Sequence, residues 1–251
     1  MTRVLATYNI KGGVGKTSAA VNLSYLASRE GMQTLLWDLD PQGGSTYLFR
    51  IKPKIRGGGE RLVRLKSDVD KLIKGTDHPG LDLLPADFSY RHMDLALDRF
   101  KRPTRRLARV IKPLRSEYDW VFLDCPPSIS LVSESVFEAA DVVLVPIVPA
   151  TLSSRTIEQL DAVVADAREN GGGVQVLAFF SMVDRRRKLH REVMERLRAE
   201  RDDVLEAAIP ASAEVERMGV QRDAIPAFAP RGRAAPAYEA LWAEVRQRLE
   251  G

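Results

Sequence analysis

Apolar residues follow two different periods along this chain of 251 residues. Short apolar runs predict buried strands, and they occupy residues 4–8, 34–39, 81–84, 120–123, 142–148, 174–180 and 207–209. Between these runs, apolar residues recur at the spacing of one helix face. This spacing predicts helices over residues 18–28, 91–115 with a break at Pro103, 130–140, 153–169, 189–201 and 235–249.

Strands that alternate with helices predict a doubly wound α/β fold, in which a mostly parallel sheet carries helices on both faces. The length suits one domain spanning residues 1–251, and no internal repeat is visible. Residues 50–78 are irregular and are expected to wrap the edge of this domain, while the glycine run 171–173 is expected to end the preceding helix. In such a sheet, ligands bind at the carboxyl ends of the strands.

Composition excludes several other classes of protein. Cys125 is the one cysteine, which excludes a disulfide framework and an all-cysteine metal site within one chain. The longest apolar run, residues 142–150, is too short and too interrupted by proline to cross a bilayer. The chain enters a strand without a charged and then apolar leader, so we expect no secretory signal and a cytoplasmic protein.

A phosphate-binding loop directly follows the first predicted strand, at residues 11–17. Its glycines let backbone N–H groups approach phosphate oxygens, Lys16 reaches the β- and γ-phosphates, and the Thr17 hydroxyl suits Mg²⁺. The helix that follows directs its positive end at the same anion. The common form of this loop has glycine where this chain has Ile10, and it does not require Lys11. Because one ATP does not need two lysines from one short loop, we expect Lys11 to serve a neighbouring molecule.

Carboxylates end two of the predicted strands. Asp124 closes the strand at 120–123, where it can orient Mg²⁺ through water or cap the turn before Pro126. Asp38 and Asp40 alternate at the end of the second strand, so they point to opposite faces unless the backbone turns between them. One of this pair can instead be a turn carboxylate.

Four segments together resemble the ParA/MinD family of deviant Walker ATPases, and most closely its small ParA branch. They are the loop at residues 11–17, the acidic segment 35–43, the segment 121–128 and the helix segment 237–241. The resemblance covers nearly the whole chain and implies a P-loop NTPase fold of the deviant Walker type. It also implies a slow, partner-stimulated ATPase that uses ATP and Mg²⁺ and forms a homodimer when ATP is bound.

The resemblance assigns roles to individual residues. Lys11 would cross the dimer interface to the partner's phosphates, Asp40 would position or deprotonate the attacking water, and Asp38 would support the magnesium shell. The implied catalytic residues are Lys11, Lys16 and Asp40. The implied metal residues are Thr17, Asp38, Asp40 and Asp124. The implied ATP-binding residues are Lys11, Gly12, Gly13, Val14, Gly15, Lys16, Thr17, Ser18, Met182, Pro210 and Ala211. Ser181 stands where MinD-like relatives often carry asparagine.

Two clusters of basic residues are candidate DNA contacts in a chain with a formal charge of +4. The first runs from residue 101 to 115 and places Arg102, Arg105, Arg106 and Arg109 on one helical face, opposite an apolar face. The second comprises Arg185, Arg186, Arg187 and Lys188. Either cluster can also be a solvated surface balanced by acids elsewhere. In the family the DNA-binding residues lie in the C-terminal half, which favours the second cluster.

Three functions compete. The resemblance favours an ATPase that binds double-stranded DNA nonspecifically and partitions or positions a plasmid, chromosome or large protein assembly over the nucleoid, stimulated by a ParB-like or cargo-adaptor protein. The alternative is a MinD-like membrane-associated ATPase, which needs an amphipathic tail; residues 241, 242, 245 and 249 instead form a core-facing stripe of the last helix. The third function, a reductase of the nitrogenase iron-protein type, needs two cysteines per subunit, and the single cysteine of this chain argues against it. No membrane contact and no N-terminal operator-binding domain are expected.

Overall fold

A single sheet organises the computed structural model, which describes residues 2–169 and 173–250. Its strands are β1 (Arg3–Thr7), β2 (Thr34–Asp38), β3 (Lys74–Gly75), β4 (Leu81–Leu84), β5 (Trp120–Asp124), β6 (Val142–Ile147), β7 (Gln175–Val183) and β8 (Val204–Pro210). Their spatial order is β3-β4-β2-β5-β1-β6-β7-β8. Every pair is parallel except β3 and β4.

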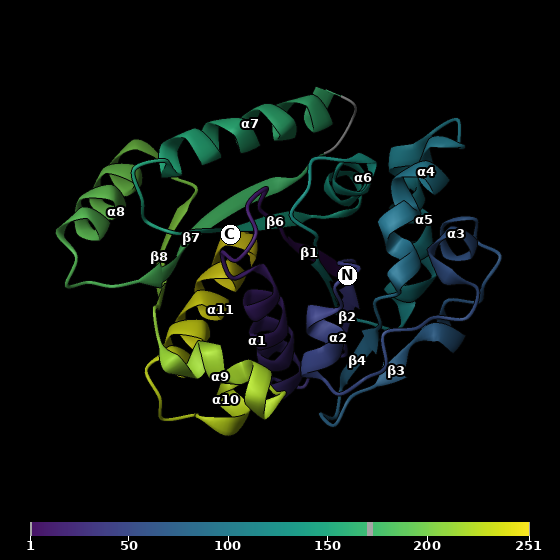
Figure 1. The fold of residues 1–251 in the computed structure, drawn as a ribbon, viewed down its shortest axis with the longest axis horizontal. Helices are drawn as coiled ribbons and strands as arrows, with labels where there is room; N and C mark the ends of the chain where they lie inside the picture. The colour runs from purple at the N-terminus through teal and green to yellow at the C-terminus, as the bar shows by residue number, and fades with distance from the viewer. Residues whose placement is uncertain (1, 170–172, 251) are drawn as a thin grey trace.

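Helices cover both faces of this sheet (Figure 1). They are α1 (Lys16–Arg29), α2 (Gly44–Leu48), α3 (Gly58–Val63), α4 (Met93–Asp98), α5 (Arg106–Ile111), α6 (Leu131–Ala139), α7 (Ser153–Glu169), α8 (Lys188–Glu200), α9 (Ala213–Gln221), α10 (Ile225–Phe228) and α11 (Ala234–Glu250). The doubly wound α/β prediction is confirmed. The assignment of residues 1–251 to a single domain stays a prediction.

Two apolar cores lie on opposite faces of the sheet, because successive strand residues point to opposite sides. On β5, Val121 and Leu123 join the core under α3 to α8, while Phe122 joins the core under α1 and α11. The strands at the centre are buried on both faces, which explains why they appear in the sequence as continuous apolar runs.

The strands and long helices lie close to their predicted ranges, but the range predicted as helical over residues 91–115 is more interrupted than expected. Within it, the two short helices α4 and α5 are separated by a 3₁₀ turn at Pro103–Arg105, at the predicted break, and 3₁₀ turns at Phe88–His92 and Lys112–Ser116 flank them. Pro103 is the first residue of its turn and Pro113 the second, because proline lacks the N–H that a helix interior needs. The irregular segment 50–78 contains α3 and β3 at the sheet edge. Residues 171 and 172 of the glycine run lie outside the described residues.

Candidate functional site

The phosphate-binding loop connects β1 to α1 at the carboxyl edge of the sheet. Gly13 and Gly15 have φ angles of 71° and 102°, in the left-handed region that favours glycine. A Cβ atom on Gly15 would lie 2.7 Å from the Ser181 hydroxyl, so a side chain at this position would also require Ser181 to shift. The loop therefore has the backbone that lets N–H groups turn toward an anion.

Side chains hold this loop in place. Asn9 donates to the Pro146 carbonyl at 2.8 Å and accepts the Lys11 backbone N–H at 2.9 Å. The Lys16 ammonium donates to the Lys11 carbonyl at 2.8 Å and is largely buried. Burial lowers the pKa of Lys16, and the negative charge of Asp124 partly offsets this shift. The Lys11 side chain is exposed.

Two buried carboxylates end neighbouring strands. Asp38 of β2 and Asp124 of β5 are register partners, and both are fully buried. Burial raises the pKa of both, and their mutual repulsion raises that of Asp38 further. Thr46 donates its N–H and hydroxyl to Asp38 at 2.8 and 2.7 Å, and Ser45 donates to Asp124 at 2.7 Å. Helix α2 thus supports both carboxylates, a contribution that the sequence reading missed.

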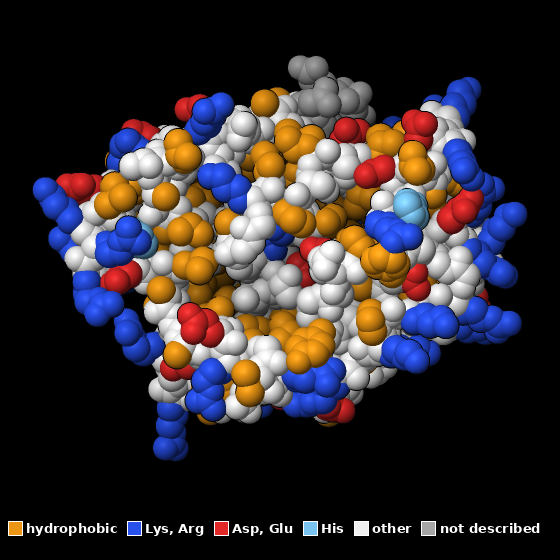
Figure 2. All heavy atoms as spheres, in the orientation of Figure 1, with side chains coloured by type: hydrophobic (Ala, Val, Ile, Leu, Met, Phe, Trp, Pro, Cys, Tyr) orange, Lys and Arg blue, Asp and Glu red, His pale blue; other side chains and the backbone are white. Residues whose placement is uncertain are grey.

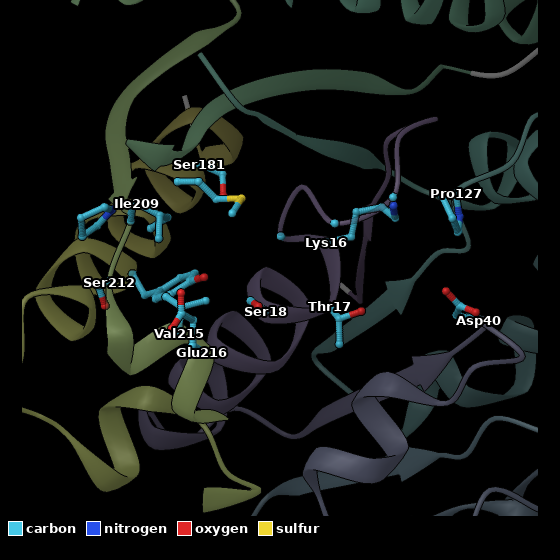
Figure 3. Close-up of a pocket in the computed structure, with 17 residues that line it drawn as sticks. Lys16, Thr17, Ser18, Asp40, Pro127, Ser181, Ile209, Ser212, Val215 and Glu216 are labelled. Carbon is cyan, nitrogen blue, oxygen red and sulfur yellow. The ribbon is translucent and has the colours of Figure 1, made fainter. Parts of the chain in front are cut away.

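Asp40 lies beyond the end of β2, where the backbone has turned. Its Oδ1 accepts the Gln42 backbone N–H at 2.9 Å, and its backbone N–H donates to Asp38 at 3.2 Å. Asp38 is fully buried at the end of β2, whereas Asp40 lies on the wall of a cavity (Figure 3). The two alternating carboxylates therefore occupy different environments, buried and accessible.

One observation bears directly on whether this site fits Mg²⁺. Asp124 Oδ1 is buried and has no hydrogen-bond partner among the described residues. The nearby Thr17 hydroxyl lowers the pKa of Asp124 and partly offsets the effect of burial. No cluster of three His, Cys, Asp or Glu side chains suited to a metal occurs in the described ranges. Mg²⁺ is commonly held by one or two protein oxygens together with waters and substrate phosphates, so the Thr17 hydroxyl and the unpaired Asp124 oxygen fit the ion. Both Asp38 oxygens already accept hydrogen bonds, and its place in the metal shell stays a prediction.

A cavity of about 320 Å³ extends from the loop to the ends of β7 and β8. Lys16, Thr17 and Asp40 lie on one side of it, and Ile209, Ser212, Val215 and Glu216 lie on the other (Figure 3). Of the residues predicted from the sequence, those that line this cavity are Gly12, Gly13, Gly15, Lys16, Thr17, Ser18, Asp40, Met182, Pro210 and Ala211. Lys11, Val14, Asp38 and Asp124 lie outside this lining.

The far side of the cavity contains residues that the sequence reading missed. These residues are Val215 and Glu216 of α9; Pro127, in the loop after β5, was also missed and lies on the opposite side, with Lys16 and Asp40 (Figure 3). Ser212 caps α9 by accepting the Glu214 N–H at 3.2 Å, and the Glu214 carboxylate accepts the N–H groups of Arg233 and Ala234. The serine at the start of a polar helix was the signal available in the sequence.

The basic clusters differ from expectation at one residue. Arg185, Arg186, Arg187 and Lys188 are exposed where β7 passes into α8. In the earlier cluster Arg102, Arg105 and Arg109 are exposed, but Arg106 is 7% exposed, so its assignment to a solvent-facing stripe is wrong. The predicted apolar face is confirmed, since its four residues are buried: Leu107, Val110, Ile111 and Leu114.

The last helix packs its apolar stripe into the core. Leu241, Trp242 and Val245 of α11 are buried against α1 and the sheet, and Leu249 packs beside them. In the described ranges, no helix combines the length and the apolar character that a bilayer crossing requires.

The raised pKa values of Asp38 and Asp124 predict a pH-dependent stability. Such carboxyl groups favour folding below the pKa of the unfolded state, about 4, and this contribution is lost as the pH rises through the folded pKa. We expect the thermal unfolding midpoint, measured without Mg²⁺, to fall between about pH 5 and about pH 9. Asp38→Asn keeps an oxygen for the two Thr46 donors and should flatten this fall. A midpoint that rises over the same range would contradict the prediction.

Comparison with known proteins gives a consistent result. A family model described as an AAA domain matches residues 2–172. The chain is 29% identical over 249 residues to the sporulation initiation inhibitor protein Soj of Bacillus subtilis, covering 98% of each protein. It is 34% identical over 225 residues to the chromosome partitioning protein ParA of Caulobacter vibrioides, covering 85% of this chain and 82% of that one.

A solved structure adds information on ligands of a similar protein. Cobyrinic acid a,c-diamide synthase from Mycobacterium smegmatis, solved with a bound ATP analog and magnesium, matches with a TM-score of 0.85 and 25% identity. The match covers 100% of this chain and 97% of that chain. The likeness therefore extends over the whole sheet and both layers of helices.

Proposed function

The chain belongs to the ParA family of P-loop ATPases, and from this premise we propose that it is a DNA-dependent positioning ATPase. It would bind ATP with Mg²⁺, dimerise around the nucleotide and bind duplex DNA without sequence preference. Hydrolysis would then separate the two protomers and release the DNA. One observation carries the proposal: Lys11 is exposed beside a phosphate loop whose own lysine, Lys16, already lies in the cavity wall.

We propose that the cavity holds ATP with its phosphates at the loop. Backbone N–H groups of the loop and the Lys16 ammonium would bind the β- and γ-phosphates. Thr17 and Asp124 would hold Mg²⁺, which would neutralise charge on the phosphate oxygens. Met182, Pro210 and Ala211 would contact the adenine at the other side of the cavity, where Val215 adds an apolar wall.

The proposed dimer gives Lys11 its role. In phosphoryl transfer, catalysis comes mainly from positioning and from neutralising charge, and a cation supplied by a partner stabilises the transition state. Lys11 of each protomer would reach the triphosphate of its partner, so ATP would hold the two copies together. Asp40 would orient or deprotonate the attacking water from the cavity wall.

The proposed track is DNA, and the exposed residues Arg185, Arg186, Arg187 and Lys188 are the candidate contacts. Cations on a surface release counterions from duplex DNA without reading its sequence. The cargo would be a plasmid, a chromosome or a large protein assembly, linked by a ParB-like or adaptor protein that accelerates slow hydrolysis. The protein would then be cytoplasmic and nucleoid-associated. The buried stripe of α11 favours this function over a membrane-associated one.

The test is a comparison of three nucleotide states. We expect a monomer without nucleotide and with ADP, and a dimer with ATP and Mg²⁺, measured by light scattering coupled to size-exclusion chromatography. Fluorescence anisotropy with a labelled duplex should show binding in the ATP state alone. For four phosphate contacts, affinity should fall roughly a hundredfold between 50 and 200 mM salt. Monomers in every state, or sedimentation with anionic vesicles in place of DNA binding, would contradict the proposal.

A further inference from the structure

Charge is distributed very unevenly along this chain. Residues 50–115 contain 18 lysines and arginines and eight acidic residues, a formal charge of +10. The remaining residues contain 20 basic and 26 acidic side chains, a formal charge of −6. Figure 2 shows lysine and arginine side chains gathered along the right-hand edge of the molecule, where Figure 1 places α3, α4, α5 and β3. The modest net charge of the whole protein therefore conceals a strongly basic end.

The positive charge of Arg185–Lys188 at the start of α8 is balanced by acidic side chains nearby in the sequence, whereas that of residues 99–115 is not. Residues 184–206 contain eight basic and seven acidic side chains. Arg186 forms an ion pair with Asp184 at 3.0 Å, and Lys188 forms one with Glu192 at 3.3 Å. Residues 99–115 contain eight basic side chains and no acidic one. A phosphate backbone would therefore meet a stronger positive field at residues 99–115 than at the start of α8.

A cavity of about 390 Å³ opens within this basic segment, and its lining is Phe100, Lys101, Arg102, Arg106 and Arg109. No carboxylate of the described residues lies within ion-pair distance of its four cations, whereas the neighbouring Arg99 and Arg105 pair with Glu60 and Glu138. The site thus combines several positive charges with no internal counterion.

Arg106 forms the anchored part of this cavity. Its Nε and Nη2 donate to the Val63 carbonyl at 2.8 and 2.5 Å, and its guanidinium lies 4.0 Å from the centre of the Phe100 ring. These contacts fix the guanidinium plane while leaving its charge without a carboxylate. Burial and the nearby charge of Arg109 lower the pKa of Arg106. A buried charge without a partner of opposite charge is costly. An anion placed between Arg106 and Arg109 would offset both the burial of the Arg106 charge and the repulsion between the two arginines.

We propose that this cavity binds a backbone phosphate of duplex DNA, making residues 99–115 a DNA-contacting surface separate from Arg185–Lys188. The proposal rests on the DNA binding proposed above. Arginine suits this ligand because its planar donors match phosphate oxygens. A polymer fits better than a small anion because the positive surface continues beyond the cavity. A second cavity in the basic part of the chain, residues 50–115, has five cations in its lining, Lys52, Lys54, Arg56, Lys71 and Lys74.

The test compares two double variants that remove the same charge from the same end of the molecule. Arg102→Ala/Arg109→Ala removes two unpaired cations of the cavity rim, and Arg99→Ala/Arg105→Ala removes two cations that are paired with carboxylates. Binding of a labelled 30-base-pair duplex is measured with ATP and Mg²⁺ over a salt series, and thermal unfolding confirms that both variants fold. Loss of two phosphate contacts should lower the salt slope by about 1.8 and weaken binding roughly 60-fold at 0.1 M salt. Arg99→Ala/Arg105→Ala, the control variant, should lower duplex affinity by less than about fivefold, because only long-range attraction changes.

The outcomes separate this inference from the proposed function. Equal losses in both variants would overturn it, because they would indicate the field of this end rather than contact in the cavity. Wild-type affinity in the Arg102→Ala/Arg109→Ala variant would overturn it while leaving DNA binding by the protein intact. Pyrophosphate serves as a small-anion probe of the same two variants. If Arg102→Ala/Arg109→Ala loses pyrophosphate binding while its duplex affinity is unchanged, the assignment to DNA is overturned. A wild-type protein that binds no duplex with ATP would refute both proposals.

Discussion

Lys11→Ala is expected to keep nucleotide binding, to abolish the ATP-dependent dimer and to lower ATP hydrolysis by about three orders of magnitude. The side chain is exposed and outside the cavity lining, so its removal leaves the phosphate site intact. Its backbone groups keep their bonds to Asn9 and Lys16 in the variant. Binding of a fluorescent ATP analogue, light scattering and phosphate release measure the three effects separately.

A mixing experiment tests whether Lys11 acts on the partner's nucleotide. Lys16→Ala removes the buried lysine from the cavity wall, so this subunit should bind nucleotide poorly but still present Lys11. Mixed with Lys11→Ala subunits, it should restore hydrolysis at the one site that has both lysines. Activity in the mixture equal to the sum of the two separate variants would refute a role across the interface, as would an ATP-dependent dimer of Lys11→Ala alone.

The phosphate end of the site was predictable because its determinants are local in sequence. A strand, a glycine loop and a helix occupy adjacent stretches of chain, and the unusual φ angles at Gly13 and Gly15 have a direct residue signature. The parallel sheet then dictates that the ends of β2 and β5 meet beside this loop, which brings Asp40 and Asp124 to it. The fold and the phosphate-loop side of the cavity followed from these two facts.

The opposite side of the cavity depends on contacts between distant segments, which periodicity does not report. Val215 and Glu216 reach the cavity because Glu214 ties α9 to the first N–H groups of α11, about 20 residues later. Likewise, Arg106 is buried because the Val63 carbonyl and the Phe100 ring accept it, although its helical spacing predicted exposure. The burial of a long polar side chain with such partners cannot be predicted from its polarity alone.

Asp40→Ala is expected to lower ATP hydrolysis by about a hundredfold or more while the ATP-bound dimer accumulates, because the substitution removes the group that orients or deprotonates water. Asp40 lies on the cavity wall, and the buried carboxylate Asp124 remains for the metal. Single-turnover phosphate release measures the chemical step, and light scattering measures the dimer. Loss of ATP binding, or hydrolysis within threefold of the wild type, would contradict this role.

Asp40→Asn separates the charge of this side chain from its structural contact. Asp40 Oδ1 accepts the Gln42 N–H, which holds the turn after β2, and an asparagine oxygen can accept the same bond. If the turn alone mattered, Asp40→Asn would hydrolyse ATP like the wild type and Asp40→Ala would not. If the carboxylate acts on water, both variants should lose activity to a similar extent. The same two variants should also form dimers that persist with ATP, since nothing in the proposed interface depends on this charge.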